Sequence, residues 1–314
     1  MILLLQYTLL FASVLMLVAL GGCFAERSGV INIGLEGIMV IGALGGALVM
    51  KFLPVDLGAF AMVSLTVLAS ALFGMLFSLL LAVAAINFKA DQTITGTAMN
   101  MLATAAATVA VKAMNTAASG GSDVSSEIAY THTKDLLLVR MGNFEFNWFM
   151  VVAVLCLIAS FVALYRTKFG LRLRACGEHP QAADSVGINV YKMRYAGVLI
   201  SGILGGLGGI VYITAGVSVW KFEYGVAGFG FLAMAVMIFG GWHPLKIALA
   251  SVLFGFCRAL GNVYSGFPVL MALNIPSVVY NMLPYLISLV VLSFTSKYSQ
   301  GPKAAGVPYD KGTR

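Results

Sequence analysis

Long apolar runs occupy most of this 314-residue chain and constrain its fold more than any other feature. A helix needs about 20 apolar residues to cross the hydrocarbon core of a bilayer. Here 60% of the residues are hydrophobic and only 10% are charged, whereas soluble domains carry roughly 25% charged residues. The composition therefore excludes a soluble enzyme of this size and a disordered chain. We predict an all-α, polytopic integral membrane protein.

We expect about nine transmembrane helices, with a range of eight to ten, some of them broken or re-entrant. The third run is long enough to tilt strongly or to hide a break, and the seventh is short enough to be a half-helix. The nine runs fall near residues 3–24, 30–50, 57–86, 94–114, 148–165, 195–217, 228–241, 245–263 and 279–296.

The basic residues predict the orientation, because cytoplasmic loops of membrane proteins carry an excess of Lys and Arg. If the basic loop 166–194 lies inside, 13 of the 19 Lys and Arg residues lie inside, five lie outside, and Arg258 lies within a run. The net charge of +7 is then a topology signal, and no nucleic-acid partner is expected. The N-terminus is predicted outside and the C-terminus inside.

The predicted organisation is a transmembrane domain over residues 1–296 and a flexible cytoplasmic tail over residues 297–314. The tail is short and contains Gly and Pro, which favours disorder. Two loops are unusually long: the polar loop 115–147 is predicted outside, and the basic loop 166–194 is predicted in the cytoplasm.

Polar residues in the second run mark a candidate functional position, because such groups are costly in the bilayer. Asn32 and Glu36 are four residues apart and share one helix face. The glycines around them would let this stretch unwind or pack closely. Two interpretations of Glu36 stay open: a polar wall or gate at a broken helix, or an interfacial carboxylate satisfied by a neighbouring helix.

A stripe of polar side chains follows the fourth run. It consists of Thr93, Thr97, Asn100, Thr104 and Thr108. At about 100° per residue, these positions fall within roughly 80° of the helix surface. We favour a hydrophilic route facing the bundle interior. The alternative is that the threonines bond to their own backbone and mediate helix contacts, although Asn100 has no such local partner.

Three further polar residues extend this hypothesis. Gln92 lies at the inner end of the fourth run, and Asn281 lies on a polar face of the ninth, so both join the candidate pathway. Arg258 is the one basic residue away from the ends of a run, and Glu36 is a potential partner for it. Snorkelling of Arg258 to the outer interface is the simpler alternative.

The sixth run contains two overlapping GxxxG spacings, at residues 202/206 and 205/209. Small residues at this spacing let two helix backbones approach closely. The pattern predicts tight helix packing and indicates no chemistry.

No motif for catalysis, a metal or a cofactor occurs in the chain. A GxxxxGK[ST] phosphate loop is absent, the three His residues show no metal-ligand spacing, and the four Cys residues are scattered singly. We therefore expect a conduit, with no catalytic residue, no metal and no cofactor.

The basic loop predicts a short helix of about two turns near residues 179–186. Pro180 suits a first helical turn, Ala182 and Ala183 favour helix, and Gly187 can end it. Considered only as local structure, this helix would be an ordinary capped connector between two transmembrane helices.

The same loop carries a resemblance to a known family. From Gly170 to Ile188 it reads G-x-x-x-R-A-x-G-x-x-P-x-A-A-x-x-x-G-I, which is similar to the coupling loop of ABC importer permeases of the ribose and branched-chain amino-acid type. The stretches 26–37, 91–100 and 240–244 resemble the nucleoside-uptake permeases that work with basic-membrane-lipoprotein-type binding proteins. The resemblance covers residues from about 20 to 296.

This resemblance implies a permease subunit of an ATP-driven importer in the bacterial cytoplasmic membrane. Its expected partners are a second, homologous permease subunit, two cytoplasmic ABC ATPase domains that hydrolyse ATP, an external substrate-binding lipoprotein and membrane lipid. The expected substrates are nucleosides, in particular purine nucleosides such as guanosine. The coupling residues that it implies are Gly177, Glu178, His179, Pro180, Ala182, Ala183 and Gly187.

Two alternatives remain at this point. The same architecture serves permeases for monosaccharides or branched-chain amino acids. A stand-alone secondary carrier would need no ATPase, but it would be expected to show internal pseudo-symmetry and paired intramembrane charges.

Overall fold

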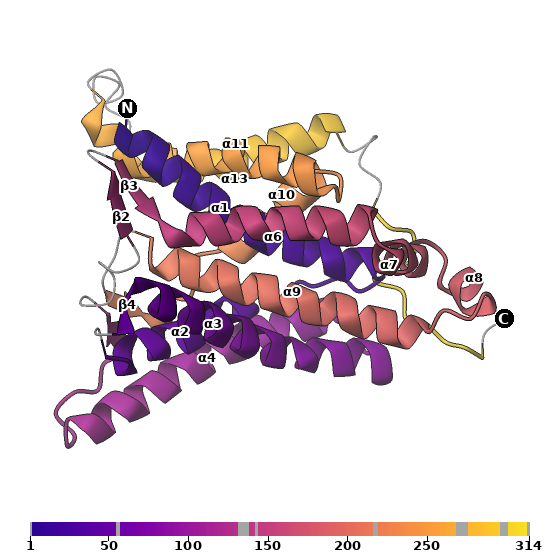
Figure 1. The fold of residues 1–314 in the computed structure, drawn as a ribbon, viewed down its shortest axis with the longest axis horizontal. Coiled ribbons are helices and arrows are strands. Elements are labelled where there is room, and N and C mark those ends of the chain that lie inside the picture. The colour runs from indigo at the N-terminus through magenta and orange to yellow at the C-terminus, as the bar shows by residue number, and fades with distance from the viewer. Residues whose placement is uncertain are drawn as a thin grey trace.

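The computed structural model describes residues 2–54, 57–130, 138–141, 144–215, 219–267, 276–295 and 301–312. Helices dominate this part of the chain (Figure 1). The helices are α1 (Ile2–Arg27), α2 (Leu35–Phe52), α3 (Ala59–Ala82), α4 (Gln92–Ala118), α6 (Trp148–Tyr165), α7 (Lys168–Glu178), α8 (Pro180–Ser185), α9 (Val190–Ile213), α10 (Phe229–Phe239), α11 (Pro244–Val263) and α13 (Ser277–Thr295).

Short elements complete the fold. α3 continues into a π-helical turn, η2 (Val83–Asn87), and 3-10 turns form η4 (Phe222–Tyr224) and η5 (Tyr264–Gly266). The strands are β1 (Glu127–Ala129), β2 (Leu138–Met141), β3 (Phe144–Asn147) and β4 (Val219–Lys221). β1 pairs antiparallel with β4, and β2 pairs antiparallel with β3.

The polytopic all-α prediction is confirmed. Within the described residues, seven helices are long and apolar enough to cross a membrane: α1, α2, α3 with η2, α4, α6, α9 and α11. The short seventh run forms α10, an apolar helix of 11 residues, and the ninth forms α13. Every predicted run therefore contains a helix, and the count of about nine is approximate.

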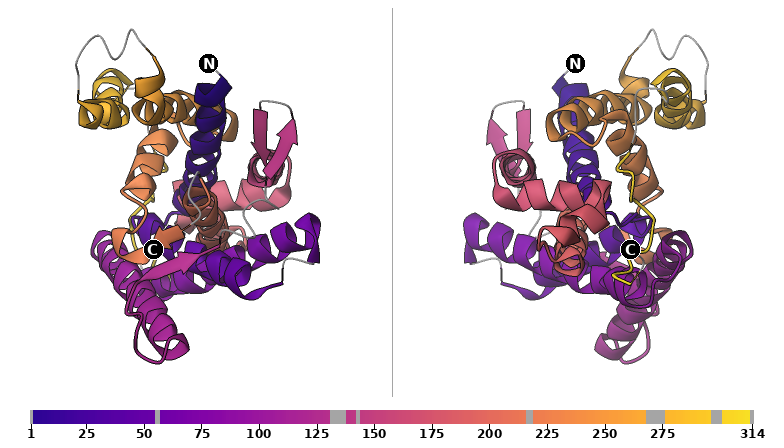
Figure 2. Two further views of the ribbon diagram at one scale, coloured as in Figure 1. Left: turned by 90° about the vertical axis from the view of Figure 1, so that its left-hand side faces the viewer. Right: turned by 90° about the vertical axis from the view of Figure 1, so that its right-hand side faces the viewer.

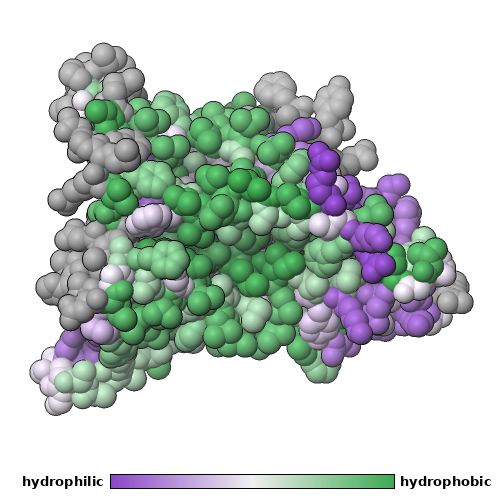
Figure 3. Space-filling view, in the orientation of Figure 1, coloured by the Kyte–Doolittle hydropathy of each residue, from purple (hydrophilic) through white to green (hydrophobic). Residues whose placement is uncertain are grey.

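The long helices follow the long axis of the molecule, which gives it two distinct ends (Figure 1). We call the end with α7, α8 and residues 301–312 the basic end, and the end with β1 to β4 the strand end. Apolar side chains cover the middle of the visible face, and hydrophilic ones gather at the basic end (Figure 3). This distribution is that of a protein surrounded by lipid, because lipid-facing surface must be apolar.

α9 forms the centre of the helix packing, against α1, α2 and α3. Its glycines make this possible. A side chain at Gly42 of α2 would collide with the backbone of Gly206, and one at Gly74 of α3 would meet both Gly202 and Gly206. The GxxxG pattern thus packs helices within this chain, as the spacing predicted.

α4 and α13 lie at opposite edges of the molecule, as the views along its axis show (Figure 2). Between them, η4 contacts α4 and α10 contacts α13. The face that includes α4, η4, α10 and α13 carries exposed side chains, among them Tyr224 and Phe231.

Residues 301–312 differ from the expected flexible tail. They lie against the basic end, where Ala304 N donates to Gly177 O at 2.8 Å and Gly306 N donates to Gly29 O at 3.3 Å. Tyr309 is buried in a small apolar cluster with Cys176 and other residues of this end. Gly and Pro are compatible with this docked conformation because they allow the backbone to bend along a curved surface. Composition alone does not show that other parts of the chain provide such a surface.

Candidate functional site: a polar joint and a coupling element

Two helices begin inside the apolar bundle, and their starting points meet. α2 begins at Leu35 after the non-helical segment 28–34, and α10 begins at Phe229 after a stretch with left-handed backbone at Ala227 and Gly228 (φ 53° and 80°). A Cβ at Gly230 would stand 2.5 Å from Glu36 N, so only glycine allows this approach. We call the residues 28–37 and 227–230 the joint.

Glu36 ties the two helix starts together. Its carboxylate accepts a hydrogen bond from Gly228 N at 2.7 Å and another from Gly230 N at 2.7 Å. The first N–H groups of a helix have no partner within the helix, and its N-terminus favours negative charge. Of the two open interpretations, the structure therefore shows a carboxylate satisfied by a neighbouring helix, at a place where helices are broken.

The non-helical segment is held by amide side chains of α4. Gln92 Oε1 accepts from Ile31 N at 2.7 Å. Asn100 Oδ1 accepts from Gly37 N at 2.8 Å, and its Nδ2 donates to Ile33 O at 3.0 Å. Backbone groups that lack a helical partner must be satisfied elsewhere inside a bilayer. Gln92 and Asn100 supply these bonds.

Asn32 holds the joint from the other side. Its side chain is only 1% exposed, and its Nδ2 donates to Ser201 Oγ of α9 at 2.9 Å. The structure thus gathers four predicted residues, Asn32, Glu36, Gln92 and Asn100, around one break in the helices.

Thr93 and Thr97 lie apart from these contacts, exposed on α4. Thr97 Oγ1 donates to Thr93 O at 2.7 Å, and Thr104 Oγ1 donates to Asn100 O at 3.3 Å. The hydroxyls therefore bond to their own backbone and still present an open polar face. Asn281 lies in α13, and its side chain falls outside the described part of the structure.

Sequence reasoning missed the partners of these residues. Ser201 and the N–H groups of Gly228 and Gly230 carried no recognisable motif. The glycines at 225, 228 and 230, together with the shortness of the seventh run, were the available signal for an interrupted helix.

Arg258 lies near the joint with its guanidinium 5.5 Å from the ring centre of Phe229, the first residue of α10.

The basic loop forms two helices, where one was expected. α7 was missed; it begins at Lys168 and is capped by the preceding Thr167, whose hydroxyl accepts from Gly170 N at 3.2 Å. α8 matches the predicted short helix, with Pro180 in its first turn. Gly187 follows it with φ 83°, as expected of a residue that ends a helix.

The predicted coupling residues divide into attached and exposed ones. A side chain at Gly177 would collide with Arg27 O at the end of α1, and Glu178 lies 3.7 Å from the Arg27 guanidinium. Pro180 and Ala183 are buried, whereas His179, Ala182 and Gly187 are exposed. Beside them, Val186 leaves 74% of its surface exposed. α7 and α8, which together form the predicted coupling element, thus contact the end of α1 on one side and leave the other side exposed.

Two of the stretches that suggested the family contact each other at this end. Trp242 Nε1 donates to Glu26 Oε2 at 2.6 Å, and Arg27 Nη2 donates to Trp242 O at 3.3 Å.

Burial, followed by the charges of Lys246 and Arg27, lowers the pKa of the nearby His243. Within the described residues, no group of three His, Cys, Asp or Glu side chains could hold a metal ion.

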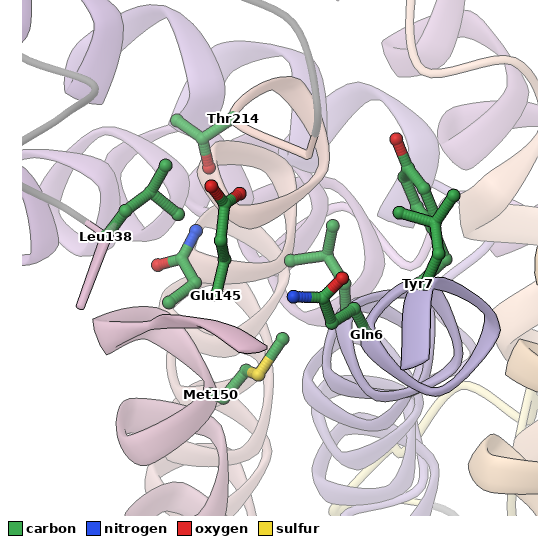
Figure 4. A pocket seen from close by; sticks show the side chains of 9 residues that line it. Gln6, Tyr7, Leu138, Glu145, Met150 and Thr214 are labelled. Atoms are coloured by element: carbon green, nitrogen blue, oxygen red, sulfur yellow. The ribbon is translucent and has the colours of Figure 1, made fainter. Parts of the chain in front are cut away.

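A separate polar cavity of about 190 Å³ opens at the strand end (Figure 4). Side chains from α1, the β2–β3 hairpin, α6 and the end of α9 line it, among them Gln6, Tyr7, Glu145 and Thr214. Asn147, also in its wall, accepts from Phe149 N and so begins α6.

Seven membrane-length helices among the described residues, packed around a glycine-rich core, are the architecture of a multi-pass membrane protein. Residues 4–292 match the family described as branched-chain amino acid transport system / permease component, and the chain belongs to that family.

Curated relatives cover nearly the whole chain. The guanosine ABC transporter permease protein NupQ of Bacillus subtilis is 43% identical over 98% of this chain and 96% of its own length. The nucleoside ABC transporter permease protein NupC of Lactococcus lactis is 38% identical over 96% of this chain and 95% of its own length. The putative glucose ABC transporter permease protein TsgC13 of Haloferax volcanii is 31% identical over 82% of this chain and 76% of its own length.

Proposed function

We propose that this chain is the permease subunit of an ABC importer that carries nucleosides, in particular purine nucleosides such as guanosine, across the cytoplasmic membrane. The observation that carries the proposal is the near full-length similarity to two permeases named for guanosine and nucleosides. The permease family and the interrupted helices in contact at the joint support the transport role.

The importer would contain partners on both sides of the membrane. Two ATPase domains dock at the basic end, in the cytoplasm, and ATP is hydrolysed on them. An external binding lipoprotein delivers substrate at the strand end, near the cavity of Figure 4. A second, homologous permease covers the exposed face of α4, η4, α10 and α13. This arrangement explains why polar and aromatic side chains lie exposed there.

The contacts suggest how motion reaches the joint. A push on the free face of α8 moves α7, because only the His179 linker separates the two helices. α7 moves the end of α1 through Gly177, Glu178 and Arg27. The segment 28–34 follows α1 directly and leads into α2, which is bonded to α10 through Glu36. The close contact of Gly177 with Arg27 and the two 2.7 Å hydrogen bonds of Glu36 would carry a displacement along this chain of contacts.

The substrate route follows the exposed polar face of α4. A nucleoside offers hydroxyls and base-edge groups, and Thr93 and Thr97 offer hydroxyls that are already bonded or open to solvent. Such groups bind a nucleoside weakly. Weak binding suits a transport route, because buried groups without partners would bind the substrate tightly and slow its passage. Asn32, Glu36, Gln92 and Asn100 shape the inner end of the route by holding the joint. The assignment of Asn281 to the route stays a prediction from the sequence.

A sugar permease is the second candidate, favoured by the similarity to the Haloferax protein and by a shared architecture. Initial uptake rates of labelled guanosine, uridine, glucose and leucine, measured in cells with and without this chain, separate the candidates. The proposal expects nucleoside uptake to depend on the chain, and uptake of glucose and leucine to be unchanged. Dependence of glucose or leucine uptake alone would overturn it.

A further inference from the structure

The C-terminal segment 301–312 lies across four separate parts of the basic end. Its backbone bonds to Gly177 of α7 and to Gly29 of the segment that leads into α2. Asp310 forms an ion pair of 2.6 Å with Lys89, which follows η2, and Lys311 lies 3.9 Å from Asp184 of α8. The segment therefore touches the coupling element and the joint at once.

Arg194 of α9 anchors the middle of the segment. Its side chain is only 1% exposed, and its Nη1 donates to Val307 O at 3.0 Å. In the described structure, its Nε and Nη2 have no hydrogen-bond partner. Its guanidinium lies 5.9 Å from the ring centre of Tyr309. A buried guanidinium is costly without partners, so the segment covers a charge that would otherwise have to reach water or headgroups.

Apolar packing adds to these polar contacts. Tyr309 is 4% exposed and lies in one cluster with Cys176 of α7, Ala183 of α8 and Val190 of α9. Its ring meets that of Tyr191 edge-on at 5.3 Å. The same ring thus joins both helices of the coupling element to the transmembrane core.

From these contacts we infer that residues 301–312 are a coupling strap: they bind α7 and α8 to the segment 28–34, so that movement of α8 reaches the joint. This inference rests on the proposed function. The strap stays docked during the transport cycle, and Arg194 and Tyr309 act as positioning residues through it. Without the strap, α8 moves against the membrane domain, and ATP is hydrolysed with less transport.

Cys176 reports docking independently of transport. It is buried in the Tyr309 cluster, and burial raises the pKa of its thiol to about 11, so it should react slowly with N-ethylmaleimide. Tyr309→Ala should speed labelling of Cys176 at least fivefold, whereas Val307→Ala should leave it unchanged. Val307 is the matched control because its side chain is 55% exposed and the variant keeps the carbonyl that Arg194 binds.

The second measurement compares labelled guanosine transported per ATP hydrolysed in the purified, reconstituted importer. Tyr309→Ala should lower this ratio at least fivefold while ATPase activity stays within twofold of the unaltered complex. A Cys176 that stays protected, an unchanged ratio, or a parallel loss of transport and hydrolysis would each overturn the strap.

Gly306→Val tests the strap if Tyr309→Ala does not accumulate. Gly306 has φ 79°, and an added Cβ would stand 2.8 Å from Ile31 Cδ1, so valine should lift the strap; Gly312→Ala, which meets only an ordinary contact at 3.6 Å, is its control. If the unaltered importer carries no guanosine, the proposed function fails, and Cys176 labelling still decides whether the segment is docked.

Discussion

α9 and α4 are both long apolar helices, yet they are held in the protein by different means. In α9, 78% of the membrane-length window is buried, against 28% in α4. α9 packs through glycine contacts with three helices, whereas α4 is attached to the joint along one side, where Gly96 packs against Gly34 and where Gln92 and Asn100 add hydrogen bonds. Close packing against three helices leaves α9 little room for adjustment, whereas a helix attached along one side can move together with its partner. The difference suggests that α9 is the fixed scaffold and α4 borders the part that moves.

The largest expected effect comes from filling the contact at the centre of α9. Gly206→Val places a side chain against the backbone of Ser70 and Gly74. The cost should exceed the roughly 1–3 kcal/mol of ordinary overpacking, because backbone cannot move aside like a side chain. We expect little or no folded protein in membranes, measured by detergent extraction and size-exclusion chromatography. Ala159→Val, on an exposed position of α6, is the control, and normal folding of Gly206→Val would refute the scaffold role.

Asn100→Leu breaks the attachment of α4 to the joint. It leaves Gly37 N and Ile33 O without their partner, at about 1–3 kcal/mol for each unsatisfied buried group. We expect a partial loss of protein and a guanosine uptake rate at least tenfold lower per molecule, with little change in the apparent affinity. Leu102→Ala, exposed on the same helix, provides the control. Normal rates in Asn100→Leu at normal expression would remove this residue from the pathway.

Glu36→Gln should have a smaller effect on the same joint. Glutamine keeps one acceptor oxygen but brings an NH₂ group toward the N–H groups at the start of α10. Hydrogen bonds to a charged group contribute about 1.5–3 kcal/mol, so thermal stability in detergent should fall measurably. Glu36→Ala, which removes both acceptors, should fall further. Equal stability of the two variants would show that these bonds do not hold α10.

Thr97→Val should have the smallest effect on folding. Its hydroxyl bonds to Thr93 O of its own helix, and exposed substitutions usually stay within about 0.5 kcal/mol. Protein amount and melting temperature should match the unaltered chain, while the uptake rate falls two- to fivefold because the polar face is interrupted. Unchanged uptake would place Thr97 outside the route.

The sequence predicted what depends on composition and local pattern. Long apolar runs force helices in a bilayer, so each of the nine runs contains a helix, and Pro180 with Gly187 located α8 correctly. The start of α2 was set too early, because Asn32 and Ile31 find hydrogen-bond partners on other helices that no local pattern shows. The roles of Gly228, Arg194 and Tyr309 could not be predicted for the same reason, since each depends on a contact distant in the chain.

One measurement tests the central claim most directly: the initial rate of labelled guanosine uptake. Cells that lack the native chain are given either the unaltered chain or Ala183→Pro, and the two rates are compared. Proline removes the hydrogen bond from Ala183 N to His179 O within α8. An importer coupled through this element should transport guanosine with the unaltered chain and show no uptake above background with Ala183→Pro, at equal amounts in the membrane. Uptake that does not depend on the chain, or a normal rate in Ala183→Pro, would contradict the account.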